Sequence, residues 1–128
     1  MVVDTSILLA ILFNENHGPW AADQLYESDS PLVMSTVNYT EALILVHDRQ
    51  PNLAEAIREM IEHSSIRLVP PDSQQAEVAA RARLRFPINL GDCFAYALAV
   101  AERCPVLTLD GDFRKCDIDV VYPLTTAS

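Results

Sequence analysis

The sequence predicts a three-layer α/β domain in which a central parallel sheet of about four to five strands is flanked by helices. Short apolar segments alternate along the chain with longer runs of helical periodicity, an order typical of parallel strands joined by right-handed crossovers. The short segments are almost continuously apolar, as expected of strands covered on both faces. With 128 residues, half of them hydrophobic, and only three glycines, the chain is expected to form one domain over residues 1–128.

The first half of the chain carries clear signals for helix starts. Pro19 suits the first turn of a helix, and Ser35 or Thr36 can cap the helix that follows the second strand. Apolar residues at helical spacing predict a further helix from Pro51. The elements expected here are a strand at residues 1–3, helices at 6–13 and 17–26, a strand at 31–34, and helices at 36–48 and 51–61.

The second half is divided in the same way. Pro70 and Pro71 end a strand, Asp72 or Ser73 caps the next helix, and a strongly apolar helix begins at Asn89 or Gly91. The elements expected here are a strand at residues 66–69, helices at 73–84 and 91–103, and strands at 106–109 and 120–122.

Five carboxylates fall where this fold would bring them together. Three of them follow strands and therefore lie at the carboxyl edge of the sheet, where open parallel sheets bind ligands, and two lie on helices that can lean over that edge. Two carboxylates about 4 Å apart repel by roughly 4 kcal/mol at an effective dielectric of about 20. A group of four or five therefore needs a cation to stay ionised at neutral pH. The five acids are Asp4, Glu41, Asp92, Asp110 and Asp112.

Glu41 is the most diagnostic of these acids because its helix is largely apolar. Residues 42–46 are all apolar, and the nearest lysine or arginine is Arg49, more than one turn away. An ionised carboxylate on a largely buried helix needs a partner. The compensation for Glu41 must therefore come from elsewhere in the fold or from a metal ion.

The other acids also admit structural roles. Asp4, followed by Thr5 and Ser6, could cap the first helix, and Asp92 lies near a helix start, where the macrodipole favours a carboxylate. Residues 110–112 could form an ordinary Asp-Gly turn. For these acids the sequence leaves both the structural and the functional role open.

Hard oxygen ligands without histidine or cysteine select Mg²⁺ or Mn²⁺. The three histidines are scattered, and the three cysteines lack CxxC spacing, so we expect reduced thiols, no zinc site and no disulfide framework. The chemistry implied by a divalent metal among carboxylates is phosphoryl transfer to water without a covalent nucleophile. The sequence therefore predicts a metal-dependent nuclease.

The net charge of −9 is unusual for a protein that binds nucleic acid, which normally presents a basic face. Much of this charge lies in the candidate site: without its five acids, thirteen acidic residues stand against nine basic ones. The longest early apolar stretch, residues 7–13, is too short to cross a bilayer, and no basic segment precedes it. We expect a soluble cytoplasmic protein without a membrane partner.

Four segments, in this order, resemble the PIN-domain ribonucleases and, within them, the VapC toxins of bacterial and archaeal toxin–antitoxin pairs. The segments are residues 2–6, Glu41 within its helix, residues 89–99 and residues 107–113. The third is the most specific, because an apolar, alanine-rich helix introduced by Gly-Asp-Cys is much more than a lone acid. The resemblance extends over essentially the whole chain.

This resemblance implies a single PIN domain over residues 1–128 that acts as an endoribonuclease with Mg²⁺ or Mn²⁺. It also implies RNA as substrate, a VapB-type antitoxin as inhibitor, and a homodimer. In the family pattern Asp4 and Asp92 would be the principal metal ligands, Glu41 would hold metal or orient the attacking water, and Ser6 would support Asp4. The positions that match the family's acidic residues are Asp4, Glu41, Asp92 and Asp110, with Asp112 as an additional or substitute ligand.

The stretch before Asn89 is short and free of glycine, whereas relatives often carry a longer Gly-rich and basic loop there. Basic residues on either side of the acids are the candidates for contact with the RNA backbone. Solvated charges on a helix end and a loop are the structural alternative for them. The candidates are Arg81, Arg83, Arg85, Arg114 and Lys115.

Three other functions share features of this sequence. A haloacid-dehalogenase-type phosphatase has an apolar strand ending in Asp-x-Asp, but that motif should open the domain, whereas here only a short tail follows it. A phosphoacceptor receiver domain needs a lysine after a late strand, and the only lysine, Lys115, is too close to the acids in sequence. A PIN-like module that binds metal or protein without cutting RNA is the third alternative.

Overall fold

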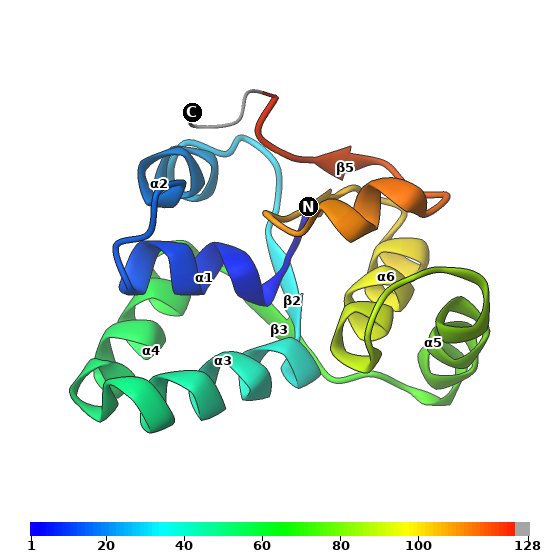
Figure 1. The fold of residues 1–128 in the computed structure, drawn as a ribbon, viewed down its shortest axis with the longest axis horizontal. Coiled ribbons are helices and arrows are strands. Elements are labelled where there is room, and N and C mark those ends of the chain that lie inside the picture. The colour runs from blue at the N-terminus through cyan, green and yellow to red at the C-terminus, as the bar shows by residue number, and fades with distance from the viewer. Residues whose placement is uncertain (125–128) are drawn as a thin grey trace.

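Five short parallel strands form one sheet in the computed structural model, which describes residues 1–124 (Figure 1). Their order across the sheet is β3-β2-β1-β4-β5, and every neighbouring pair is parallel. The predicted α/β class with a parallel central sheet is therefore confirmed. The strands are β1 (Val2–Val3), β2 (Val33–Ser35), β3 (Arg67–Val69), β4 (Val106–Leu107) and β5 (Val120–Val121).

Helices connect these strands in the order that the sequence predicts. No helix in the described part of the chain is both long enough and apolar enough to span a membrane. The α-helices are α1 (Thr5–Leu12), α2 (Gly18–Tyr26), α3 (Thr36–Arg49), α4 (Ala54–His63), α5 (Ser73–Arg85) and α6 (Leu90–Glu102). Two 3-10 helices, η1 (Pro51–Leu53) and η2 (Gly111–Lys115), complete the set.

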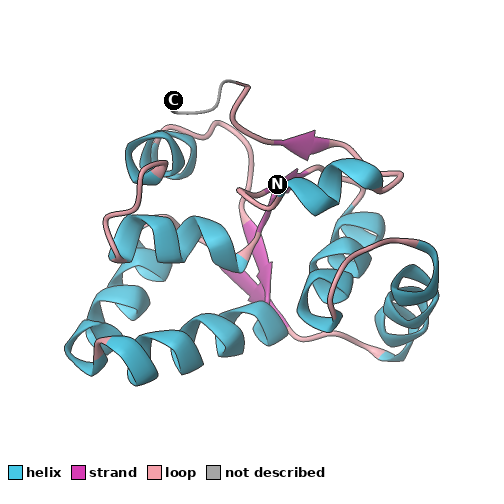
Figure 2. Ribbon diagram, in the orientation of Figure 1, coloured by secondary structure: helices cyan, strands magenta, loops and turns pink. Residues whose placement is uncertain are grey.

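The strand side chains separate the core into two layers. Val3 and Leu107 pack in one cluster with the apolar faces of α1 to α4, whereas Val2 and Val106 pack in a second cluster with α6 and η2. This division arises because successive side chains of a strand point to opposite faces of the sheet. Figure 2 shows the resulting arrangement, with α1 to α4 on one side of the strands, α6 on the other, and α5 outside α6.

Local side-chain caps determine where three of the helices begin. Ser35 accepts a hydrogen bond from the backbone N of Val37 at 3.2 Å, and Asp72 accepts one from the backbone N of Gln75 at 2.8 Å. Asn89 caps α6. Of the two starts that the sequence allows for each helix, the structure selects Ser35, Asp72 and Asn89.

Two segments differ from the sequence prediction. Residues 110–112 do not form an isolated turn, because the Asp110 side chain accepts a hydrogen bond from the backbone N of Asp112 at 2.9 Å and thereby caps η2. The helix expected from Pro51 begins with the separate 3-10 turn η1. Gln50 supplies no side-chain cap there, and its carbonyl instead accepts from the backbone N of Leu53 at 2.9 Å.

Candidate active site

The five predicted acids belong to segments that meet at the carboxyl edge of the sheet. Asp4 follows β1, and Asp110 and Asp112 come shortly after β4, which pairs with β1 in register. Glu41 lies on α3, and Asp92 lies in the first turn of α6. The first turns of α1, α3 and α6 lie around the same end of the central strands (Figure 1), and hydrogen bonds among them, described below, show that they are in contact.

Asp4 is almost fully buried, at 3% exposure. Its Oδ2 accepts hydrogen bonds from the hydroxyls of Ser6 and Thr108, both at 2.8 Å. Burial raises the pKa of Asp4, while these two hydroxyls act in the opposite direction and the Asp110 charge adds to the increase. The Asp4 carboxylate is thus oriented by neutral donors that do not neutralise its charge.

The same two hydroxyls connect the ends of β1 and β4. Ser6 Oγ accepts from the backbone N of Leu109 at 2.9 Å, and Thr108 Oγ1 accepts from the backbone N of Asp110 at 2.9 Å. Thr108 was missed in the sequence prediction. The signal that could have identified it is a hydroxyl directly after β4, within the otherwise apolar run of residues 105–109, since a buried hydroxyl needs a partner.

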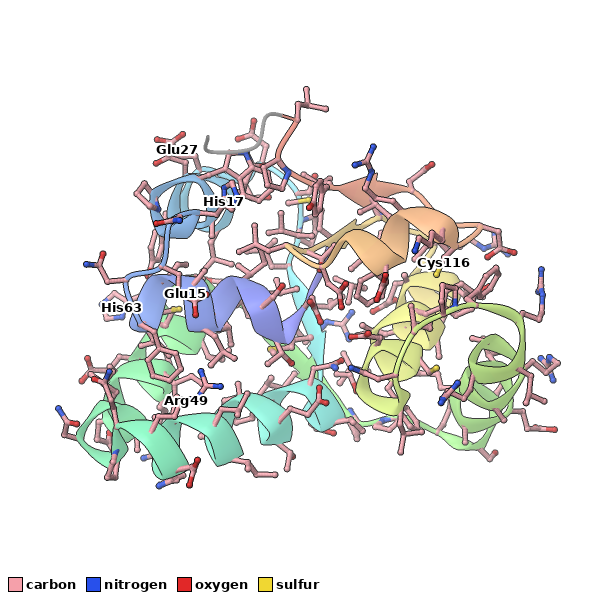
Figure 3. The ribbon with its side chains drawn as sticks, viewed as in Figure 1. Glu15, His17, Glu27, Arg49, His63 and Cys116 are labelled. Atoms are coloured by element: carbon pink, nitrogen blue, oxygen red, sulfur yellow. The ribbon has the colours of Figure 1, made fainter. Side chains whose placement is uncertain are left out.

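Glu41 is bound by two neutral side chains, which orient its carboxylate without neutralising its charge. Its Oε1 accepts from Asn38 Nδ2 at 2.9 Å and from Thr5 Oγ1 at 3.2 Å, and Thr5 shares its single hydroxyl proton with the Asn38 backbone carbonyl at 3.0 Å. Arg49 does not neutralise this charge: Figure 3 shows it between α3 and the far end of α1, and its guanidinium lies 5.6 Å from the centre of the Phe13 ring. The sequence analysis identified the need for a partner but not Asn38 or Thr5.

Asp92 combines a structural role with an electrostatic one. It forms a capping box with Asn89: the Asn89 side chain accepts from the backbone N of Asp92 at 2.9 Å, and Asp92 Oδ2 accepts from the backbone N of Asn89 at 3.3 Å. Burial, followed by the charges of Asp4 and Asp110 and, to a smaller extent, Glu41, raises the pKa of Asp92 to about 7. Four acids from separate segments therefore act on one another.

Asp110 and Asp112 are less deeply placed. Besides capping η2, Asp110 contributes negative charge to both Asp4 and Asp92. Asp112 forms an ion pair with Lys115 at 3.6 Å, and its side chain is half exposed. Asp110 is therefore tied electrostatically to the buried acids, whereas Asp112 has a cationic neighbour of its own.

The basic residues proposed to contact RNA fall into two groups. Arg85 pairs with Asp117 at 3.4 Å, Arg114 lies 5.2 Å from the centre of the Tyr122 ring, and Lys115 pairs with Asp112. Arg81 and Arg83 are exposed on α5 and take part in none of the ion pairs of residues 1–124. These two arginines are therefore the freer candidates.

The donor set at this edge fits Mg²⁺ or Mn²⁺, because it consists of carboxylate oxygens. Burial raises the pKa of the neighbouring Cys93 thiol, with Arg83 acting in the opposite direction, so a thiolate ligand is disfavoured. As placed, no three His, Cys, Asp or Glu side chains within residues 1–124 lie close enough together to hold one ion. The acids are electrostatic neighbours that would have to close around a metal.

Comparison with known proteins gives a consistent result along the sequence. The PIN domain model matches residues 1–119. Ribonuclease VapC28 of Mycobacterium tuberculosis is 34% identical over 122 residues, which cover 88% of this chain and 91% of that protein. Ribonuclease VapC of Mycolicibacterium smegmatis is 34% identical over 132 residues, which cover 95% of this chain and 100% of that protein.

Solved structures share the fold at lower sequence identity. VapC20 of Mycobacterium tuberculosis, described as a sarcin-ricin loop cleaving toxin, has a TM-score of 0.82 at 19% identity, covering 95% of this chain and 98% of that chain. A toxin–antitoxin complex from Klebsiella pneumoniae has a TM-score of 0.74 at 21% identity, with 94% of each chain covered.

Proposed function

Because the chain belongs to the PIN-domain family and, within it, to the VapC ribonucleases, we propose that it is an endoribonuclease that requires Mg²⁺ or Mn²⁺. We further propose that it is the toxin of a toxin–antitoxin pair. The observation that carries the metal-dependent activity is the convergence of Asp4, Glu41, Asp92 and Asp110 from four segments at one edge of the sheet, where burial and the neighbouring charges also raise the pKa of Asp92. A divalent cation would relieve this repulsion and keep all four carboxylates ionised.

Asp4 and Asp92 are the principal ligands in this proposal. Asp4 is oriented by two hydroxyl donors and Asp92 by the capping box of α6, so the fold orients both side chains, while the other acids would have to close around the metal. Asp110 completes the acidic group, with Asp112 as an additional ligand at the exposed rim.

A divalent metal held by these carboxylates would supply positive charge for the phosphate and favour deprotonation of the attacking water. Glu41, oriented by Asn38 and Thr5, would hold metal together with Asp4 and Asp92, and would also position the attacking water and accept its proton. The water oxygen bonds to phosphorus as the bond from phosphorus to the leaving ribose oxygen breaks, and that ribose oxygen takes up a proton from solvent. No side chain forms a covalent intermediate.

Contacts with the RNA backbone fall to Arg81 and Arg83 in this proposal. The charge of Arg83 acts on Cys93, the residue after Asp92, so α5 brings this arginine next to the helix that carries Asp92. Because the other three basic candidates already have intramolecular partners, they would have to release these partners to bind phosphate.

An antitoxin with a basic segment is the proposed partner, because an arginine or lysine could occupy the acidic site in place of metal. The VapBC and toxin–antitoxin complexes among the structural neighbours support a partner of this kind. We also propose a homodimer, because Ile44 on α3 is 61% exposed within an apolar stretch. Light scattering of the purified protein measures the mass of the assembly.

Cleavage of defined RNAs by the purified chain tests the activity. We expect cleavage with Mg²⁺ or Mn²⁺, no cleavage in EDTA, and a loss of at least about 100-fold in Asp92→Asn, since removal of a single ligand or charge at such a site typically has effects of this order. Equal activity of the parent and Asp92→Asn would refute the site assignment. A parent that is inert on several RNA classes but binds Mn²⁺ would favour the non-cutting PIN-like module.

Inhibition is tested separately by adding the antitoxin encoded beside this protein. A stoichiometric complex should not cleave RNA, and a complex with full activity would contradict the proposed blocking of the acidic site. A haloacid-dehalogenase-type phosphatase is not supported, because the family match places the chain among PIN domains.

A further inference from the structure

Asn38 lies in the first turn of α3, three residues before Glu41, and is completely buried. Its Nδ2 donates one hydrogen bond to Glu41 Oε1 at 2.9 Å and another to the backbone carbonyl of Gly91 at 2.9 Å. Because both partners can only accept, they define which end of the amide is the nitrogen. One side chain thus joins the Glu41 carboxylate to the turn of α6 that carries Asp92.

Gly91 contributes to the same arrangement from the opposite side. A Cβ atom at position 91 would lie 2.0 Å from Glu41 Oε2, so the carboxylate occupies the space that a larger residue would fill. The φ angle of Gly91 is not positive, so its backbone conformation is open to other residues. The close approach of Glu41 is therefore what requires a glycine at this position.

Packing alone does not explain an asparagine at position 38. Its Oδ1 is buried and has no hydrogen-bond partner in the described part of the chain. Such an atom destabilises a fold relative to an apolar side chain of the same size. The favourable contribution of Asn38 comes from its two donated hydrogen bonds, and both of these concern the placement of Glu41 and α6.

Glu41 needs such help because its side chain is long and flexible. The donors Asn38 and Thr5 both bind Oε1, while Oε2 lies over Gly91. The carboxylate is thus held by its two donors and by the open space at Gly91, next to the residue that precedes Asp92. Without these contacts, the distance between the acids of α3 and α6 would depend on a freely rotating side chain.

We propose that Asn38 and Gly91 are positioning residues for the metal site: Asn38 holds the Glu41 carboxylate against the first turn of α6, and Gly91 provides the space for it. This inference rests on the proposed metal-dependent function. Neither residue touches the reacting atoms, and both act through Glu41.

Two substitutions test the proposal: one removes the donors of Asn38, and the other fills the space at Gly91. Asn38→Leu retains a similar volume and removes both donors together with the unpartnered acceptor. Gly91→Ala adds one methyl group within a helix, where alanine is the more favourable residue. The atom that this methyl group meets belongs to the end of the flexible Glu41 side chain, so the carboxylate moves and the helix stays in place.

Mn²⁺ affinity, measured from the electron paramagnetic resonance signal of free Mn²⁺, is the main readout. We expect each substitution to weaken binding by about 10- to 100-fold, as is typical for residues that orient metal ligands. Combined with Glu41→Gln, neither should weaken binding further, because all three act through one carboxylate. Urea unfolding in EDTA should give a lower midpoint for Asn38→Leu than for the parent, because Glu41 and the Gly91 carbonyl each lose a donor, and a single cooperative transition shows that the variant folds.

Thr40→Ala is the matched control for these variants. Thr40 is exposed in the same part of α3, and its hydroxyl bonds only to the Thr36 carbonyl, at 2.7 Å. This variant should bind Mn²⁺ like the parent, which separates the role of Asn38 from a general perturbation of α3.

Parent-like Mn²⁺ affinity in Gly91→Ala and Asn38→Leu, or losses that add to that of Glu41→Gln, would overturn the positioning role while the proposed function stands. If Asn38→Leu does not fold, Gly91→Ala alone decides the outcome. A parent protein that neither binds Mn²⁺ nor cuts RNA refutes the proposed function and this inference with it.

Discussion

Asp92→Asn should make the metal-free protein more stable although it removes a proposed metal ligand. The pKa of Asp92 is raised from 3.8 to about 7 in the folded protein, first by burial and then by the charges of Asp4, Asp110 and Glu41. Between these two values the folded protein retains a proton that the unfolded chain has released. The contribution of Asp92 to stability therefore falls as the pH rises from about 4 to about 7, and is level above that.

The magnitude follows from the size of the shift. About three pKa units at 1.36 kcal/mol each give a ceiling of about 4 kcal/mol for the destabilisation at pH 8. At pH 5 the destabilisation amounts to only about one pH unit of this effect, because pH 5 lies about one unit above the unfolded pKa of 3.8 and Asp92 in the folded protein is still protonated. The quantity to compare is the gain in free energy of unfolding of Asp92→Asn over the parent. This gain should be larger at pH 8 than at pH 5, by up to about 3 kcal/mol.

Urea unfolding in EDTA at the two pH values measures this difference. Asparagine retains an acceptor oxygen for the backbone N of Asn89, so the capping box is preserved and the comparison isolates the charge. Asp72→Asn is the matched control, because Asp72 also caps a helix through its side chain, accepting from the backbone N of Gln75, and asparagine caps equally well. This control should show no comparable change between pH 5 and pH 8.

A difference between Asp92→Asn and the parent that is the same at both pH values would refute the electrostatic reasoning. So would an Asp92→Asn protein that is less stable than the parent at pH 8. Either result would mean that the four acids do not repel one another enough to raise the pKa of Asp92.

Further predictions concern the proton, the Asp4 support and the α6 cap. Mn²⁺ affinity should rise about tenfold per pH unit below pH 7 and level off above pH 7, because the metal competes with the Asp92 proton. Calorimetric titrations that show no pH dependence of the affinity would contradict this. Thr108→Val should lower the free energy of unfolding in EDTA by about 1–3 kcal/mol, because Asp4 loses a buried donor. Thr108→Ser keeps the hydroxyl and should retain most of the stability. Equal urea midpoints for Thr108→Val and the parent would exclude this role. Asn89→Ala should lower the free energy of unfolding by about 1 kcal/mol through loss of the α6 cap, while Asn89→Asp should retain the cap. Thermal unfolding distinguishes these two variants.

The order of strands and helices was predictable because its signals are local. Strands are short apolar runs, and helix starts carry capping residues such as Ser35 and Asp72 that need only their own neighbours. The η2 helix was not predictable in this way. Its cap, Asp110, belongs to an Asp-Gly sequence that is equally compatible with a simple turn, and the choice between the two depends on packing.

The acids of the candidate site were predictable from position, but the donors that orient them were not. Thr108 lies 104 residues from Asp4, and Asn38 lies 53 residues from Gly91. Contacts of this range are determined by tertiary structure and leave no periodic pattern in the sequence. Their only trace is a polar residue within an otherwise apolar segment, which indicates that a partner exists without indicating which one.

The donors that the fold supplies to the buried acids are all neutral. Asp4 is bound by hydroxyls, Glu41 by an amide and a hydroxyl, and Asp92 by a backbone N–H. Of the ion pairs found in residues 1–124, none joins these three acids to a lysine or arginine. Neutral donors orient a carboxylate but leave its charge uncompensated, so the positive charge has to come from outside the chain. A divalent metal and a basic segment of an antitoxin would both supply this positive charge at the same acidic site. The proposed catalysis and the proposed inhibition would therefore exclude each other.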